Sequence, residues 1–443
     1  MDVIDTLMEL IAIDSSNPFT SQRIKKRDGD RWILGGNERR IAKVVEQKLV
    51  AAGFTCRRQP VHRGLDGRRY HNIVAEKGDG DRSLLCYGHL DTVTTRPWSS
   101  PAAALRPRMA QIPSDQGGID GVVGLGAADM KAGLAVMLSA FADVKPRGFR
   151  LKLAFGVDEE FYSLGAHVLA QSAFMNDVAA ILVPEIDDGP NAGYGPATLT
   201  IGRLGRCDFH IRVPGTGGHG AGAASNTGVN AATETAALVM ALEKIRQTHA
   251  DDFDFLEGRQ PDPSFASRVA GSFYVNRIDA GDGTLSIPVQ GDLSLSYTFT
   301  PARSVAAGEA WLSAVVAGMY ASGELKPVEI DHRIFRAEVA LSPRPTPPCG
   351  AYLTPADHPF CEYVRGHIDA TVGFRGYNMG FSVCDQNVFH HYRPDIPIVD
   401  VAPLGQNFHR SGEWVGVESV RQLQALYREV ARGFGTYLSE CGP

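Results

Sequence analysis

The first half of the chain alternates short apolar runs with helical patterns. Three runs have the length of buried strands and end in turn or acidic residues, at 83–88, 150–157 and 179–184. Helical patterns precede and separate them, at 2–13, 37–53, 130–144 and 163–174. Strands that alternate with helices predict an α/β fold, with a mostly parallel sheet and helices on both faces.

The pattern changes near residue 198. Strand-like segments follow at 199–201, 207–213, 270–278 and 289–299, with helical patterns at 229–247 and about 304–321. This order predicts a small α+β domain. Prolines between 343 and 348 then lead into a helix near 358–371, a strand at 396–401 and a last helix near 416–438. We therefore expect a catalytic domain formed by residues 1–198 and 341–443, interrupted by an inserted domain at 199–340.

Composition narrows the class of protein. The 443 residues carry a formal net charge of -6, which gives no reason to expect nucleic acid or an anionic membrane as partner. The N-terminal residues are acidic where a secretory signal is basic, and no apolar run reaches transmembrane length. The seven cysteines include no Cys-x-x-Cys pair and fit reduced thiols. We expect a cytoplasmic protein that acts on a small molecule.

Polar clusters follow the apolar runs. His89 and Asp91 end the first, Glu159 and Glu160 follow the second, and Glu185 follows the third. In open α/β sheets, ligands bind beyond the carboxyl ends of the strands. This placement predicts that the five side chains share one site.

The residue types in these clusters suit divalent metal ions. His89 and Asp91 lie on the same side of an extended chain, so Asp91 can hold the second ring nitrogen of a metal-bound histidine. Adjacent carboxylates such as Glu159 and Glu160 repel each other unless a cation neutralises them. Because successive residues point in different directions, Glu160 can bind metal while Glu159 acts as a base on water. Each feature also has a simpler interpretation, as a polar pair or a solvated acidic turn.

Two further candidates come from elsewhere in the chain. Asp129 lies among small residues at 124–133, where it could bridge two cations or cap the helix that follows. His409 lies far downstream, and Glu413 could support it. Asp187 and Asp188 compete with Glu185 for a ligand role. A carboxylate-rich set without cysteine fits one or two Zn, Mn or Co ions.

The chain resembles the metallopeptidase family of aminoacylases, carboxypeptidase G, succinyl-diaminopimelate desuccinylase and acetylornithine deacetylase. Five segments carry the resemblance: 88–93, 126–133, 158–160, 184–185, and His409 with Glu413. It implies that His89 and Glu185 bind one metal and that Glu160 and His409 bind the other. Asp129 would bridge them, with a cis peptide bond to Met130, while Asp91 supports His89 and Glu159 serves as general base.

The resemblance also assigns the inserted domain. It implies a lid that commonly forms a homodimer interface. His219, in the glycine-rich loop 215–220, matches a lid histidine that reaches a neighbouring subunit's site and stabilises the oxyanion. The simpler alternative is a turn residue in a flexible loop.

The chain departs from this family in three places. The turn that begins at Asn17 is interrupted by a polar, basic segment at 18–36. The lid strand at 294–299 lacks the arginine that often binds a substrate carboxylate, although Arg303 or Arg277 could substitute. The loop 377–385 is aromatic and apolar where small polar residues are usual, and its first members are candidate substrate contacts: Tyr377, Asn378, Met379 and Gly380.

These observations lead to one main hypothesis and three alternatives. The main hypothesis is a metal-dependent hydrolase that cleaves the amide bond of a small N-acyl amino compound. The aromatic loop and the missing arginine also suggest an aminohydrolase that releases ammonia from an activated aromatic amine. Dipeptidase or carboxypeptidase action is a third possibility. A non-catalytic binding protein is the fourth, but neither a ligand nor Glu159 is missing from the sequence.

Overall fold

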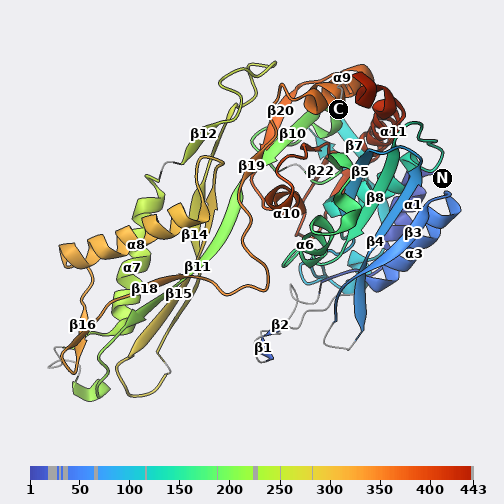
Figure 1. Ribbon diagram of the computed structural model, residues 1–443. Coiled ribbons are helices and arrows are strands. Elements are labelled where there is room, and N and C mark those ends of the chain that lie inside the picture. Colours follow the sequence, from blue (N-terminus) through green and yellow to red (C-terminus); the bar gives the residue numbers. More distant parts are fainter. Residues whose placement is uncertain are drawn as a thin grey trace.

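The computed structural model contains two bodies joined by a narrow neck (Figure 1). It describes residues 1–17, 27–28, 31–32, 38–63, 68–114, 117–186, 188–222, 228–249, 251–281 and 283–440. Most of the predicted insertion at 18–36 lies outside this range, as does Asp187. Two short strands, β1 (Arg27–Asp28) and β2 (Arg31–Trp32), are described within the insertion.

Four parallel strands form the centre of the larger body. They lie in the order β21 (Ile398–Asp400), β9 (Val178–Val183), β5 (Ser83–His89) and β8 (Arg150–Gly156). Every residue of β5 is buried, since both faces of this sheet are covered, and this explains its continuous apolar sequence. The carboxyl ends of the four strands meet at one edge of the sheet.

Antiparallel strands extend the sheet on both sides. Beyond β8 lie β4 (Arg69–Gly78) and β3 (Thr55–Arg63). Beyond β21 lies β10 (Thr198–Arg203), which also pairs with β19 (Tyr352–Leu353) and β20 (Gly376–Gly380).

Helices cover both faces of the sheet. One face packs against α1 (Val3–Ile11), α3 (Arg39–Ala51), α5 (Ala132–Ala140), α9 (Pro359–Val372) and α11 (Val417–Glu440). The other packs against α6 (Leu164–Ala170) and α10 (Asp385–Tyr392), with Leu169 and Phe389 in its core. The predicted α/β class, with a mostly parallel sheet covered on both faces, is confirmed.

A second small sheet lies next to the loops that contain Asp129 and His409. Its strands lie in the order β22 (Gly405–Gln406), β23 (Trp414–Gly416), β7 (Gly117–Val123) and β6 (Arg108–Ser114). A short helix, α4 (Pro101–Ala104), packs beside it. Because β7 pairs with β23, the segment that contains Asp129 is brought beside the loop that contains His409.

The smaller body is an antiparallel sheet with two helices. Its strands lie in the order β14 (Ser272–Ala280), β15 (Gln290–Phe299), β11 (Gly205–Pro214) and β18 (Glu338–Leu341). Helices α7 (Ala231–Arg246) and α8 (Val305–Ser322) share its core, and the hairpin β16 (Val328–Ile330) and β17 (Arg333–Phe335) follows α8. The hairpin β12 (Asp252–Asp254) and β13 (Arg268–Ala270) packs against the larger body, since Phe255 and Val269 belong to the core of that body. Among the described residues, no helix is long and apolar enough to cross a membrane.

Candidate metal centre

The strand ends bring the first group of predicted ligands together. His89 is the last residue of β5, and Glu185 follows β9 after a single proline. The Nε2 atom of His89 lies 3.5 Å from Oε2 of Glu185 and 3.1 Å from Oδ1 of Asp129. All three side chains are buried.

Asp129 also belongs to a second group. Its other oxygen, Oδ2, lies 3.1 Å from Nε2 of His409, and that nitrogen lies 3.1 Å from Oε2 of Glu160. In each group of three, the donor atoms lie within 4.8 Å of one another. The two oxygens of Asp129 therefore face different histidines, as a bridging carboxylate requires.

The donor chemistry fits two divalent cations. Imidazole nitrogens and carboxylate oxygens without a thiolate suit Zn, Mn or Co. Burial raises the pKa of Glu185 to about 8, although His89 opposes the shift. Burial and the neighbouring Asp129 also raise the pKa of Glu160, although His409 opposes them. Bound cations would remove this penalty by neutralising the carboxylates.

The backbone around Asp129 is held by Glu413. Its carboxylate accepts N–H bonds from Gly126 (2.8 Å), Ala128 (2.8 Å) and Asp129 (3.0 Å). Gly126 has a φ of 76°, a left-handed conformation that favours glycine. The peptide bond between Asp129 and Met130 is cis, as the family resemblance implied. The sequence suggested that Glu413 supports His409, whereas its hydrogen bonds hold the backbone around Asp129.

Asp91 connects His89 to the segment that contains Glu159. The Nδ1 atom of His89 lies 3.0 Å from the Asp91 carbonyl oxygen and 3.6 Å from its Oδ1. The Asp91 carboxylate also accepts the backbone N–H groups of Glu159 and Glu160, each at 3.1 Å. Asp91 thus contacts both a predicted metal ligand, His89, and the backbone of the predicted base, Glu159.

Asn17 completes this support, and sequence reasoning did not assign it a role. Its Nδ2 donates to Oδ2 of Asp91 (3.0 Å) and to Oδ1 of Asp158 (2.9 Å). The available signal was its position in the turn that begins the interrupted family motif.

Glu159 lies beside the cluster and belongs to neither donor group. Burial raises its pKa well above the usual value, and nearby Asp385 and Glu160 add to the shift while His89 opposes it. Asp385 itself is buried and accepts a hydrogen bond from the Tyr87 hydroxyl. A carboxylate outside the ligand groups and next to them is placed to exchange protons with a reacting water.

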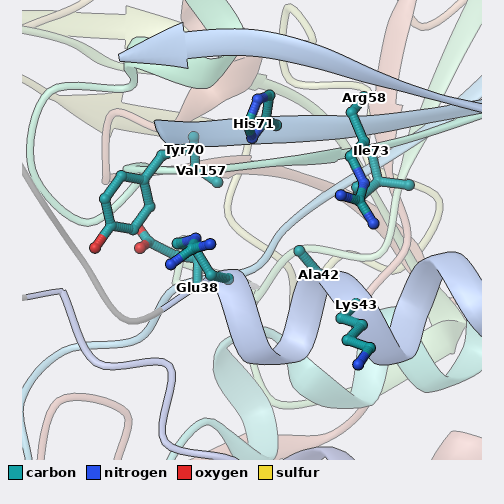
Figure 2. Close-up of a pocket in the computed structure, with 9 residues that line it drawn as sticks. Glu38, Ala42, Lys43, Arg58, Tyr70, His71, Ile73 and Val157 are labelled. Carbon is teal, nitrogen blue, oxygen red and sulfur yellow. The ribbon is translucent and has the colours of Figure 1, made fainter. Parts of the chain in front are cut away.

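Figure 2 shows a separate cavity that is lined by residues of α3 and β4. It has a volume of about 150 Å³ and lies between α3 and β4, with Glu38, Arg39, Arg58, Tyr70 and His71 in its lining. Glu38 is buried, and its carboxylate has no hydrogen-bond partner among the described residues. Burial and Asp91 raise the Glu38 pKa well above its usual value. The cavity contains none of the predicted metal ligands.

The remaining predicted residues lie apart from the donor groups. His219 accepts an N–H bond from Ala221 (3.2 Å) and forms a β-bridge with Ser286, both within the smaller body. The four candidate substrate residues, Tyr377, Asn378, Met379 and Gly380, lie in β20 and are buried. Arg277 and Arg303 pair with local carboxylates, those of Asp279 and Asp251.

Known proteins resemble this chain along most of its length. It is 26% identical over 399 residues to the succinyl-diaminopimelate desuccinylase of Maricaulis maris, covering 88% of this chain and 90% of that one. It is 32% identical over 244 residues to carboxypeptidase G2 of a Pseudomonas strain, covering 54% and 50%.

Solved structures share the fold. A tripeptidase from Staphylococcus aureus superposes with a TM-score of 0.66 at 15% identity, covering 98% of both chains. Human carnosine dipeptidase 1 superposes with a TM-score of 0.65 at 14% identity, covering 98% of this chain and 97% of that one.

The fold and the donor groups define a metal-dependent hydrolase. The model of peptidase family M20/M25/M40 matches residues 85–432, which include every predicted metal ligand. The chain belongs to this family. It is a hydrolase of carbon–nitrogen amide bonds, and the main functional hypothesis drawn from the sequence is confirmed at this level.

Proposed function

We propose that the substrate is a small N-acyl amino compound and that the reaction takes place beside Asp129 and Glu159. The observation that carries the proposal is the pair of 3.1 Å contacts from the two Asp129 oxygens to His89 and His409, with Glu159 outside both donor groups. Succinyl-diaminopimelate desuccinylase and carboxypeptidase G2 among the relatives support this substrate class. Their names give no support to the aromatic aminohydrolase alternative.

Each residue has a distinct task in this proposal. His89, Asp129 and Glu185 would hold one cation, and Asp129, Glu160 and His409 would hold the other. When bound, the cations polarise the scissile carbonyl and make a water more acidic. Glu159 takes a proton from the attacking water and delivers it to the leaving nitrogen, so the C–N bond breaks to give an acid and an amine. Asp91 holds the Glu159 backbone during both transfers.

We further propose a cytoplasmic homodimer formed through residues 199–340, which act as a lid. The edge strand β14 supports this, since its outer side is unpaired among the described residues and its side chains Tyr274 and Ile278 are exposed. In the dimer, His219 would enter the partner's site and stabilise the oxyanion.

The decisive test is Glu159→Gln together with Glu159→Ala. Both variants should lower kcat by about 10²- to 10⁴-fold, because proton transfer is lost. Metal content and melting temperature should stay as in the parent protein, because Glu159 is outside both donor groups. As a matched control, Glu160→Gln removes the neighbouring carboxylate and should lower metal content. Full activity of Glu159→Ala would overturn the assignment.

Analysis of the products tests the reaction itself. Ammonia release without a carboxylic acid product would support the aromatic aminohydrolase in place of the amide hydrolase.

A further inference from the structure

The carboxylate of Asp188 is held by the loop that follows β20, and it belongs to neither donor group. Its Oδ1 accepts the backbone N–H of Phe381 (3.0 Å), and its Oδ2 accepts the backbone N–H of Ser382 (2.8 Å). The guanidinium of Arg203, the last residue of β10, lies 3.6 Å from Oδ1. Two successive N–H groups beside a guanidinium are suited to bind one carboxylate. We call these three donors the anion receptor, and Asp188 occupies it.

The anion receptor is built independently of Asp188. Arg203 is fully buried, and its Nε and Nη2 atoms each lie 2.9 Å from Oδ2 of Asp400. Its Nη1 donates to the Ser382 hydroxyl (2.9 Å), which joins the guanidinium to the loop. A side chain at Gly380 would meet Nη1 of Arg203 at 2.9 Å, so glycine lets the loop approach this closely. The two N–H groups and the guanidinium therefore keep their places whether or not a carboxylate lies between them.

The anion receptor lies close to the proposed reaction centre. Arg203 Nη2 donates to the carbonyl of Ile186 (2.9 Å), the residue after the proposed metal ligand Glu185. Cys384 follows the receptor loop, and burial raises the pKa of its thiol well above the usual value. Arg203 opposes this shift, whereas Glu159 and Glu185 add to it, so the charges of the proposed base and of a proposed ligand reach the receptor loop.

Asp188 determines the charge that a substrate group meets here. Its side chain is 16% exposed, so an approaching group can reach the edge of its carboxylate. With Asp188 in place, the single guanidinium of Arg203 faces two carboxylates, those of Asp188 and Asp400. A substrate carboxylate would lose its water, find both N–H donors already used and be repelled by the excess negative charge. An uncharged group of similar size avoids the repulsion and most of the desolvation cost.

We propose that Asp188 is a specificity-determining residue that fills the anion receptor, so that the protein accepts substrates with an uncharged group at this position and discriminates against a carboxylate. The proposal rests on the proposed function and narrows its substrate class. It also implies that the receptor becomes available to an external carboxylate once the side chain of Asp188 is removed. Both consequences can be measured separately.

Acetate tests the receptor without any turnover, since it reproduces the carboxylate that Asp188→Ala deletes. Calorimetric titration with acetate should give a Kd at least tenfold lower for Asp188→Ala than for the parent protein. Acetate that binds at the cations appears equally in both proteins and does not affect the comparison. Asp188→Asn removes the charge but keeps the place filled, so its Kd should stay near that of the parent. Equal acetate binding by the parent protein and Asp188→Ala would overturn the proposal.

Two substrate pairs test the specificity. N-acetyl-leucine and its carboxamide differ at the amine end, and N-succinyl-leucinamide and its terminal amide differ at the acyl end. In the pair whose variable group reaches the receptor, the parent protein should prefer the amide by at least tenfold in kcat/KM, and Asp188→Ala should raise the acid-to-amide ratio by at least tenfold. Preference for the acid in both pairs, or ratios that Asp188→Ala leaves unchanged in both, would refute the proposal. If Asp188→Ala does not fold, Asp188→Asn gives the same comparison with a smaller expected shift, because it removes only the charge.

The smaller body offers a matched control. Asp254, on β12, likewise accepts two backbone N–H groups, those of Leu256 (3.2 Å) and Gly258 (3.0 Å), and lies 3.6 Å from the guanidinium of Arg268. Asp254→Ala therefore deletes the same kind of contact away from the donor groups. Its acid-to-amide ratios should equal those of the parent protein. A change in these ratios as large as that in Asp188→Ala would contradict a specific role for Asp188.

The two arms separate this proposal from the proposed function. If the parent protein cleaves no N-acyl compound, the proposed function fails, while the acetate titrations still decide whether Asp188 fills an anion receptor. If cleavage occurs but Asp188→Ala changes neither acetate binding nor the acid-to-amide ratios, the role of Asp188 alone fails.

Discussion

At the residue scale, two carboxylates outside the donor groups, Glu413 and Asp91, position the candidate metal ligands through hydrogen bonds. Glu413 accepts three backbone N–H groups of the loop that contains Asp129, and Asp91 joins His89 to the Glu159 backbone. Neither residue needs to touch a cation to act. Ligand position here depends on backbone hydrogen bonds from charged acceptors, which are stronger than those from neutral ones.

Glu413→Gln tests this dependence. The amide has one acceptor oxygen where the carboxylate has two, so at least one of the three N–H groups loses its partner. We expect metal affinity to fall by about 10- to 100-fold, as is typical when support behind a ligand is removed. Metal titration followed by calorimetry measures it. Glu429→Gln, an exposed glutamate on α11, serves as control, and equal affinities in the two variants would contradict the role of Glu413.

The sequence identified side chains that follow recognisable strands, and it missed those whose meaning depends on a distant partner. His89, Glu160 and Glu185 were found because apolar runs end beside them. Asn17 was given no role, because its partners Asp91 and Asp158 are 74 and 141 residues away. Glu38 and Asp385 were missed for the same reason. A buried carboxylate is recognisable only when the chain that buries it is known.

At the scale of elements, the central strand β8 contains a buried ammonium group. Lys152 Nζ donates to the Phe174 carbonyl (2.6 Å), lies 4.4 Å from the Phe174 ring centre and is paired with Asp177. Partial burial opposes ionisation of Asp177, but the Lys152 hydrogen bond and charge prevail and lower its pKa. The ion pair joins β8 to the start of β9.

Asp177→Asn should destabilise the fold, because it leaves the Lys152 charge buried without its partner. We expect a loss of about 2–3 kcal/mol at pH 7, at the low end for such a deletion because Asp177 is partly exposed. The folded-state pKa is below the unfolded value of about 3.9, so this contribution is present above pH 4 and disappears as pH falls through the folded pKa. Urea unfolding between pH 7 and pH 3 measures the difference. The control is Asp143→Asn, at an exposed position. If the difference in unfolding free energy between the parent protein and Asp177→Asn grows on acidification, the pairing is contradicted.

The elements that the sequence predicted are those with strong periodicity, and some of those that it missed are polar. Others are buried but short, such as β20, whose residues were taken as part of a loop at 377–385. Strand β3 lies at the edge of the sheet and contains no residue that is fully buried. Its sequence therefore lacks the apolar run that revealed β5, β8 and β9. The hairpin of β6 and β7 was missed in the same way, since β7 is buried only over its last three residues.

At the scale of the whole molecule, we expect the cations to contribute to folding as well as to chemistry, since the candidate ligands come from segments between residues 89 and 409. Removing the metal with a chelator should lower the melting temperature of the larger body. A ligand at about 1,000 times its Kd stabilises the native state by about 4 kcal/mol, a shift of several degrees. Calorimetry with and without chelator measures this drop in melting temperature, and added Mn or Zn should reverse the drop. The melting temperature of His409→Ala should fall less on chelation, because one donor group is already incomplete. If the chelator leaves the melting temperature of the parent protein unchanged, the assignment of two metal-binding groups is contradicted.

The position of β21 has a consequence for how the protein is made. This strand, residues 398–400, lies between β9 and β10, which precede it in the chain by about two hundred residues. A ribosome that has released the first 390 residues has produced both neighbours with an empty place between them and two unpaired edges. Such edges invite pairing with other chains. The nascent protein therefore depends on its last tenth to close the sheet, and the same stretch supplies His409, so protection from aggregation and the ability to bind the second cation arrive together at the end of synthesis.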